Sequence, residues 1–232
     1  MESLMPTSES QGHGKAYEIE IQKRCYEMTE EELSTYKQCD KYDIRKEHNR
    51  INQKNVSIKV SASLRIDCGD IIRFLTSENM ELILVVYKQN DDIKIAVKTI
   101  LFNFDDFKAI LHRDIESLCG ESYEEWFQKV KNYDSSVKLI PYGKCEDKSY
   151  KDDKKSLCDK IKYFNIAPKV DSKKQRRVQC SIDLSKISDL QLQDFGGGEL
   201  YGKTYKVRVN SGKRKRNRRN AVTANEIIMI DL

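Results

Sequence analysis

The sequence predicts an α/β fold, in the broad sense that includes α+β, with a central mixed β-sheet flanked by helices. Two observations carry this prediction: strand-like apolar segments fill the middle of the chain, and segments with apolar residues three or four positions apart precede and follow them. We expect a disordered leader over residues 1–14, because that stretch is polar, and a single domain over residues 15–232.

The helical segments show apolar periodicity together with capping residues. The first carries Tyr17, Ile21 and Cys25 along one stripe, and Thr29 is placed to cap the second. An aspartate cap and a terminal glycine bound the segment 105–120. Helices are expected over residues 15–28, 29–39, 105–120 and 122–133, and a turn followed by a short helix over residues 67–77.

The strand segments are short, rich in β-branched residues and bounded by turn residues. Asn90-Asp91 lies between the two most apolar of them and predicts a hairpin. Residues 144–155 are expected to form a charged loop. Strands are expected over residues 41–48, 55–61, 80–89, 92–104, 176–187, 202–210 and 225–232.

Composition excludes several classes of protein. Hydrophobic residues make up 38% of the chain and charged residues 34%, and no window approaches the ~20 apolar residues that span a membrane. The seven cysteines are scattered singly, as are the three histidines, so a zinc site is not expected. With no secretory signal visible, we expect a cytoplasmic protein, or a nuclear one in a eukaryotic host.

The net charge of +5 is unevenly distributed. Residues 169–219 hold 15 Lys/Arg against 5 Asp/Glu, which is +10 and leaves −5 for the rest of the chain. Such a basic region attached to a slightly acidic body is typical of proteins that bind a polyanion.

The segment "VSIKVSAS", residues 56–63, raises the question of chemistry. Val56 and Ile58 point to one side of a strand, so Lys59 points to the other, between serines. Lys59 is either a solvated lysine on a half-exposed strand or a lysine that faces a cleft and takes part in chemistry there. Asp43 precedes it in an expected strand and Glu18 lies in the first helix. Two carboxylates and a cation in this order suit metal-dependent phosphodiester hydrolysis, so we expect Mg²⁺ as the cofactor.

The motifs "GKAYE…KYDI…VSIK…CGDIIRF" resemble the core of the PD-(D/E)XK nuclease superfamily, over about residues 14–75. The segments "YDI…SIK…GDIIRF" and the basic segment "QRRVQCS" most resemble those of small type II restriction endonucleases. The resemblance implies a restriction-endonuclease-like catalytic core over residues 15–135, a basic DNA-recognition region over residues 165–232, and cleavage that leaves a 5′-phosphate.

Carried over by motif, the resemblance gives Asp43 the metal-bridging role and Lys59 the role of catalytic lysine. Glu18 binds the metal directly or through water. One position departs from the family pattern, because Ser57 stands where an acid is expected before x-Lys. Either Glu18 or Glu20 compensates for the lost charge, or Ser57 holds a metal-bound water, or the enzyme is impaired. Asp40 and Glu47 are the alternative candidates if the register is shifted, and Asp70 is expected to cap a helix, although it could lie near DNA.

The basic region contains two candidate DNA-contacting segments. In the first, period-two alternation places Arg176, Val178 and Cys180 inward and the intervening residues outward, where arginine and glutamine suit guanine and adenine edges; a plain polar sheet face is the alternative. The second, residues 206–219, has eight Lys/Arg and no acid, so it suits phosphate contacts or a nuclear-localisation signal. The candidate DNA-binding residues are Lys173, Gln175, Arg176, Arg177, Gln179, Lys213, Arg214 and Arg216.

The sequence therefore predicts a Mg²⁺-dependent endonuclease acting on double-stranded DNA, in the type II restriction class, and working as a homodimer because a palindromic site calls for a two-fold protein. Two alternatives stay open. One is a junction resolvase or repair nuclease on the same core. The other is a non-catalytic DNA-binding protein in which Ser57 marks a decayed site.

Overall fold

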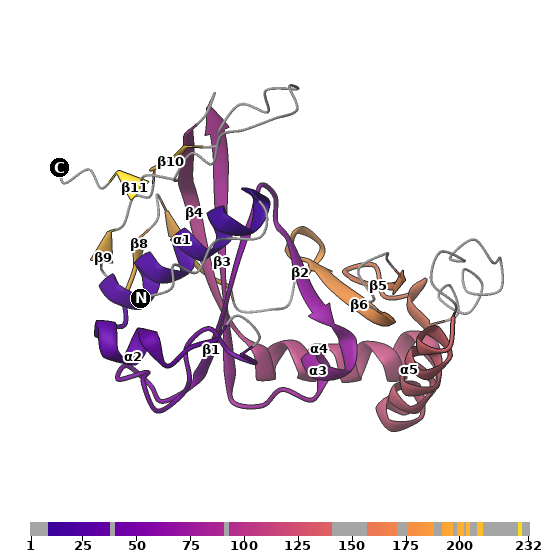
Figure 1. Ribbon diagram of the computed structural model, residues 1–232. Helices are drawn as coiled ribbons and strands as arrows, with labels where there is room; N and C mark the ends of the chain where they lie inside the picture. Colours follow the sequence, from indigo (N-terminus) through magenta and orange to yellow (C-terminus); the bar gives the residue numbers. More distant parts are fainter. Residues whose placement is uncertain are drawn as a thin grey trace, which may run out of the picture. The chain divides into compact units, whose positions relative to one another are not determined.

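A computed structural model gives the structure of the protein (Figure 1). It describes residues 9–37, 40–90, 93–140, 157–170, 176–187, 192–196, 199–201, 203–204, 208–210 and 227–228. The predicted charged loop and five of the candidate DNA-binding residues, Lys173, Gln175, Lys213, Arg214 and Arg216, lie outside the described residues.

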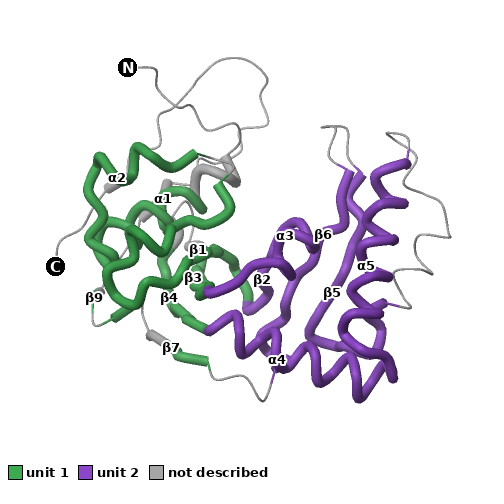
Figure 2. Tube along the Cα trace, turned by 90° about the horizontal axis from the view of Figure 1, so that it is seen from below, with its two compact units in different colours: residues 1–63, 80–102, 192–232 green, residues 64–79, 103–191 purple. Residues whose placement is uncertain are grey.

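The chain folds into two compact units that are each built from separate segments (Figure 2). Unit 1 comprises residues 1–63, 80–102 and 192–232, and unit 2 comprises residues 64–79 and 103–191. The segments proposed from sequence as core and recognition region, residues 15–135 and 165–232, each contribute to both units.

Unit 1 contains the larger sheet, and this sheet is mixed. Strands β1 and β3 are parallel, with Ser57 opposite Leu82 and Lys59 opposite Leu84, whereas β4 and β7 are antiparallel. The sheet order is β1-β3-β4-β10-β11, with β7 also paired to β4. The predicted fold class, a central mixed sheet flanked by helices, is confirmed. The described elements of this unit are α1 (Glu9–Arg24), α2 (Glu30–Ser34), β1 (Asn55–Ser61), β3 (Met80–Asn90), β4 (Ile93–Asn103), β7 (Leu192–Gly196), β8 (Glu199–Leu200), β9 (Lys203–Thr204), β10 (Arg208–Asn210) and β11 (Ile227–Ile228).

Burial explains why β3 has a continuous apolar run. Ile83 and Val85 belong to the core that also contains Val56 and Ile58 of β1. Leu82 and Leu84 point to the other face of the sheet and are also at most 1% exposed. A strand that is covered on both faces has no polar side, which is why its sequence does not alternate.

Helix α1 supplies the other side of this core. Tyr17 and Ile21 are fully buried and Cys25 is 2% exposed, as the predicted stripe requires. The helix begins at Glu9 and ends at Arg24, not at Lys15 and Met28. The polar residues before Lys15 therefore continue the helix, in a stretch where we expected a disordered leader.

Two local predictions in unit 1 have different outcomes. Thr29 caps α2 in a reciprocal capping box with Glu32, as its sequence suggested, although α2 ends at Ser34. The strand predicted over residues 41–48 is wrong. Only a single β-bridge forms there, between Ile44 and Val56, because a hydrogen-bonded turn follows at His48, whose main-chain N–H donates to Arg45.

Unit 2 contains a three-stranded antiparallel sheet in the order β2-β6-β5. Strand β2 occupies residues where we expected a turn. The turn signal, Gly69, lies at a register irregularity between Asp67 and Gly69 and has φ 73°, so it bends the strand without ending it. The described elements are β2 (Arg65–Asp70), α3 (Ile71–Leu75), α4 (Phe104–Asp114), the π-helical turn η1 (Ile115–Cys119), α5 (Tyr123–Lys138), β5 (Phe164–Val170), β6 (Arg176–Asp183) and the 3₁₀ turn η2 (Leu184–Lys186).

The apolar face of the unit 2 sheet packs against the helices of the same unit. Register pairs Ile66 and Phe164 with Ile182, so the three share one face. The ring of Phe164 lies 6.0 Å from Phe107 of α4 and 6.2 Å from Trp126 of α5, centroid to centroid. These aromatic contacts form the centre of the unit 2 core.

Helix boundaries in unit 2 follow local capping chemistry. Asn103 caps α4 through the N–H of Asp105, so the predicted aspartate cap is wrong. The segment ends as predicted at Gly120, which has φ 74°, a left-handed conformation that favours glycine. Ser122 caps α5 in a capping box with Glu125. Asp70 accepts a hydrogen bond from the N–H of Arg73, which confirms it as the cap of α3.

Two findings bear on the predicted environment. Within the part of the chain that the structure describes, no helix is both long and apolar enough to cross a membrane. The cysteines there form no disulfide bond with one another, namely Cys25, Cys68, Cys119, Cys158 and Cys180.

Asp134 links α5 to the sheet of unit 2 and yields a stability prediction. Its side chain is buried, accepts a hydrogen bond of 2.9 Å from the N–H of Val178 and pairs with Lys138 at 2.6 Å. Asp134→Ala leaves that buried N–H without an acceptor, so we expect a loss of about 1–3 kcal/mol in the free energy of unfolding. Lys138→Ala removes only an exposed partner and should cost less than about 1 kcal/mol. Urea denaturation of both variants measures the difference, and equal losses would contradict this role for Asp134.

Candidate functional site

Asp43 is held against the main chain of β1. Its N–H donates to the carbonyl of Val56 at 2.9 Å, next to the bridge that Ile44 makes with the same residue. This position turns the carboxylate toward the following residues of β1. The Oδ2 atom of Asp43 accepts hydrogen bonds from the N–H of Ile58 at 2.6 Å and from the hydroxyl of Ser57 at 3.2 Å.

Lys59 lies beside the same carboxylate. Its Nζ is 3.7 Å from Oδ2 of Asp43. The side chain of Lys59 is 33% exposed and that of Asp43 is 23% exposed, so the pair is half-buried. Lys59 is therefore not the fully solvated lysine of the simpler interpretation.

Glu18 joins this group from α1. Its side chain is 21% exposed and forms an ion pair of 3.3 Å with Lys15. Burial raises the pKa of Glu18 above its usual range, and the negative charge of Asp43 raises it further. Lys15 and Lys59 act in the opposite direction. Glu18, Asp43 and Lys59 thus form one electrostatic cluster within unit 1.

The hydroxyl of Ser57 donates a hydrogen bond to the carboxylate of Asp43, which an acidic side chain at the same position would repel. The residue is 8% exposed, and its Oγ is 3.2 Å from Oδ2 of Asp43. A carboxylate at this distance from Asp43 would add a like charge, which disfavours ionisation of both groups. Ser57 instead fixes the orientation of Asp43 and leaves the cluster with two carboxylates.

The donor set fits Mg²⁺ bound by few protein ligands. Within the described residues, no group of three or more His, Cys, Asp or Glu side chains could hold a metal ion. Mg²⁺ is commonly bound by one or two carboxylates, with waters and substrate phosphates completing the octahedron. Burial and the charge of Asp43 both raise the pKa of Glu18, and a divalent cation would offset the contribution of Asp43.

The alternative acids have structural roles or lie on the surface. Asp40 pairs with Arg45 at 2.7 Å, and this hydrogen bond lowers the pKa of Asp40. Glu47 is exposed, and Asp70 caps α3. The arrangement favours Asp43 among the acids that the sequence offered.

Two residues of the site were missed by sequence reasoning. Lys15 pairs with Glu18, and the side chain of Gln22 donates to the main-chain carbonyl of Asp43 at 2.6 Å. A signal was present in the sequence, because Gln22 follows Glu18 by four positions and therefore shares its helix face.

The candidate DNA-contacting residues of β6 lie in unit 2. Arg177 and Gln179 are half-buried on the polar face of the sheet, opposite Lys169 and Ala167 of β5. The Nε atom of Arg177 has no hydrogen-bond partner within the described part of the chain. Arg176 points to the other face and donates to the carbonyl of Lys138 at 3.1 Å, so it also holds the end of α5.

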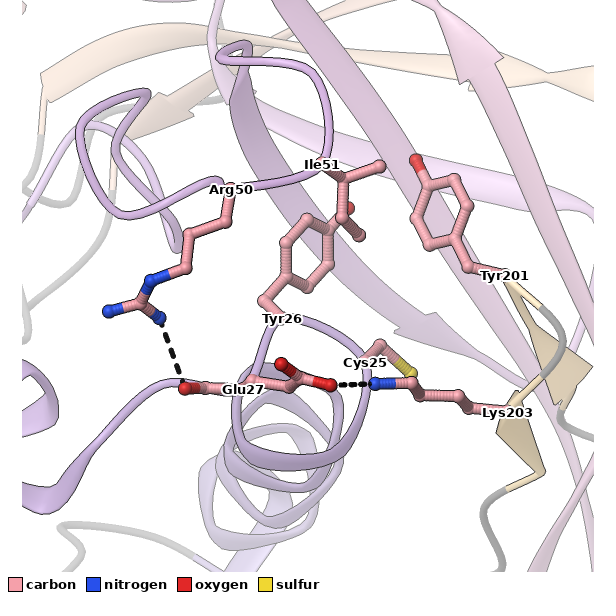
Figure 3. Close-up of a pocket in the computed structure, with 7 residues that line it drawn as sticks. All are labelled: Cys25, Tyr26, Glu27, Arg50, Ile51, Tyr201 and Lys203. Atoms are coloured by element: carbon pink, nitrogen blue, oxygen red, sulfur yellow. Dashed lines mark hydrogen bonds and ion pairs between the residues drawn. The ribbon is translucent and has the colours of Figure 1, made fainter.

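A separate pocket of about 250 Å³ lies at the end of α1 and includes two tyrosines (Figure 3). The rings of Tyr26 and Tyr201 meet edge to face at 5.9 Å. Figure 3 shows Arg50 and Lys203 directed toward Glu27, Arg50 onto its carbonyl and Lys203 onto its carboxylate. Both cations thus contact the protein itself. Burial raises the pKa of the Cys25 thiol to about 12, so it is not a reactive thiolate at neutral pH.

Comparisons of this chain with family models, curated proteins and solved structures give no match. The resemblance to PD-(D/E)XK nucleases therefore stays a prediction from the motif residues.

The raised pKa of Glu18 predicts a pH-dependent stability. The folded protein holds this proton more tightly than the unfolded chain, so its stabilising effect is full below the ordinary pKa of 4.5 and is lost as pH rises through the folded-state value. At neutral pH without metal, Glu18→Gln should therefore melt at a higher temperature than wild type. The difference should shrink as the pH falls toward 4.5.

Millimolar Mg²⁺ supplies the complementary measurement. It should raise the melting temperature of the wild-type protein and have little effect on Glu18→Gln, because only the former keeps both carboxylates. A lower melting temperature for Glu18→Gln at neutral pH would contradict the electrostatic interpretation of this residue.

Proposed function

We propose that the protein is a Mg²⁺-dependent endonuclease that hydrolyses phosphodiester bonds in double-stranded DNA. One observation carries the proposal: Glu18, Asp43 and Lys59, which come from a helix, a loop and a strand, form a single half-buried cluster. Two carboxylates and a cation are the groups that metal-dependent phosphodiester hydrolysis needs. Their convergence is what an active site requires and what scattered surface charges do not produce.

The chemistry of each residue follows from its position. Mg²⁺, when bound by Glu18 and Asp43, would supply Lewis-acid activation of a phosphate. Lys59 places a positive charge beside these carboxylates, where it can orient the attacking water and stabilise negative charge that develops on the phosphate. Ser57 and the N–H of Ile58 keep the Asp43 carboxylate oriented.

The polar face of the unit 2 sheet supports DNA as the substrate. Lys169 and Arg177 are register partners on adjacent strands, and Gln179 lies two residues further along the same face. Arginine and glutamine can make paired hydrogen bonds to guanine and adenine in the major groove. The finer proposal is a type II site-specific enzyme that acts as an intracellular homodimer.

The first test of this function is loss of cleavage on removal of the lysine. Lys59→Ala should reduce the rate of plasmid cleavage by about 10²–10³-fold, because the charge that stabilises the transition state is gone. Asp43→Ala should have an effect of at least this size, and added Mg²⁺ should rescue neither variant. Lys46→Ala is the matched control, because Lys46 is an exposed lysine close to Asp43 in sequence.

Rates are measured with Mg²⁺ or EDTA, with melting temperature and DNA binding as controls for folding. Full activity of Lys59→Ala would show that Lys59 is not the catalytic lysine. Cleavage of plasmid into discrete fragments supports the restriction activity, and cleavage confined to branched junctions identifies a resolvase. Binding without cleavage by the wild-type protein identifies a non-catalytic protein.

The second test concerns base recognition. If Arg177 contacts a base edge, Arg177→Ala should cost about 1–3 kcal/mol of binding free energy on the preferred site and relax sequence preference. Lys213→Ala, in the basic run, should weaken binding to every sequence and reduce its salt dependence, as loss of a phosphate contact does. Competition binding on specific and unrelated DNA distinguishes the two. If both variants had the same effect on specific and unrelated DNA, the assignment of Arg177 to a base contact would be wrong.

A further inference from the structure

Gln22 is a buried amide that touches Asp43. Its residue is 1% exposed, and its Nε2 donates to the main-chain carbonyl of Asp43 at 2.6 Å. Gln22 lies one helical turn after Glu18 on α1, so one helix face carries both the candidate ligand and this contact.

With this contact, both the N–H and the carbonyl of the Asp43 main chain are hydrogen-bonded. On one side, the N–H of Asp43 donates to the carbonyl of Val56 in β1 at 2.9 Å. On the other side, the carbonyl of Asp43 accepts from Gln22 in α1. Asp43 is therefore fixed between the strand that carries Lys59 and the helix that carries Glu18.

The chemistry of Gln22 is unfavourable for packing alone. Burial of a primary amide costs free energy unless its polar atoms are paired, and an apolar side chain of the same size would fill this position without that penalty. Only one of its two polar atoms is matched within the described residues, since the buried Oε1 has no hydrogen-bond partner there. The bond to Asp43 is thus the contact that an apolar replacement could not supply.

We propose that Gln22 is a positioning residue that fixes the separation of Glu18 and Asp43 for a divalent cation. This inference rests on the proposed function and extends it to a residue outside the family motif. Gln22 acts through Asp43 and is not itself a ligand. Residues that orient metal ligands in this way typically change metal affinity by about 10–100-fold when they are removed.

The test is Gln22→Met, which keeps the length and burial of the side chain and removes the donor. Asn49→Leu is the matched control, because Asn49 is also 1% exposed and donates to a main-chain carbonyl, that of Lys54, at 2.7 Å in the same unit. Gln22→Met loses this one hydrogen bond, whereas Asn49→Leu also loses the bonds that Asn49 makes with Asn52 and with the N–H of Ile51. The control should therefore lose at least as much stability as Gln22→Met. Only Gln22→Met should also need an Mg²⁺ concentration at least about 10-fold higher for half-maximal binding and cleavage.

Mg²⁺ affinity is read in two ways, from the rise in melting temperature with Mg²⁺ and from the Mg²⁺ dependence of plasmid cleavage, both at a temperature where all three proteins are folded. Weakened Mg²⁺ affinity in Gln22→Met alone supports the inference. Unchanged Mg²⁺ affinity in Gln22→Met, or an equal loss in Asn49→Leu, overturns it. Failure of the wild-type protein to bind Mg²⁺ or cleave DNA overturns the proposed function instead.

Discussion

The position of Asp43 against β1 is the constraint on which the candidate site depends. A single bridge, between Ile44 and Val56, brings a loop residue to the edge strand of the sheet. The carboxylate then lies over the N–H of Ile58, one residue before Lys59. Because β1 alternates, this strand places its apolar residues in the core and its lysine beside the acid at the same time.

The carboxylates that would bind a metal ion also destabilise the folded protein when no metal is bound. Burial raises the pKa of Glu18, and the negative charge of Asp43 raises it further. Lys15 and Lys59 offset part of this rise. Ser57 limits the negative charge of the cluster, since an acid in that place would put a further charge next to Asp43. Under the proposed function, a phosphate of the substrate would take the place in the coordination of Mg²⁺ that this acid would otherwise fill.

The sequence predicted those parts of the structure that depend on local patterns. Alternation in β1 put Lys59 on the correct face, and the capping residues Thr29 and Asp70 located the starts of α2 and α3. Strand β2 was missed, because its Asp-Cys-Gly-Asp sequence resembles a turn and its pairing partner β6 lies more than 100 residues away, as the bond between Arg65 and Ser181 illustrates. The helix period places Gln22 on the face of Glu18, but it does not reveal the contact of Gln22 with Asp43, because that contact joins residues 21 positions apart.

The central claim is that Glu18 and Asp43 share one divalent cation, and protein cleavage by bound iron tests it most directly. Fe²⁺ can replace Mg²⁺ at oxygen-rich sites, and with ascorbate and hydrogen peroxide it generates hydroxyl radicals that cut the nearby main chain. The account predicts cuts near Glu18, Asp43 and Ser57–Lys59, all suppressed by excess Mg²⁺. Cuts elsewhere alone, or no cuts that Mg²⁺ suppresses, would contradict it.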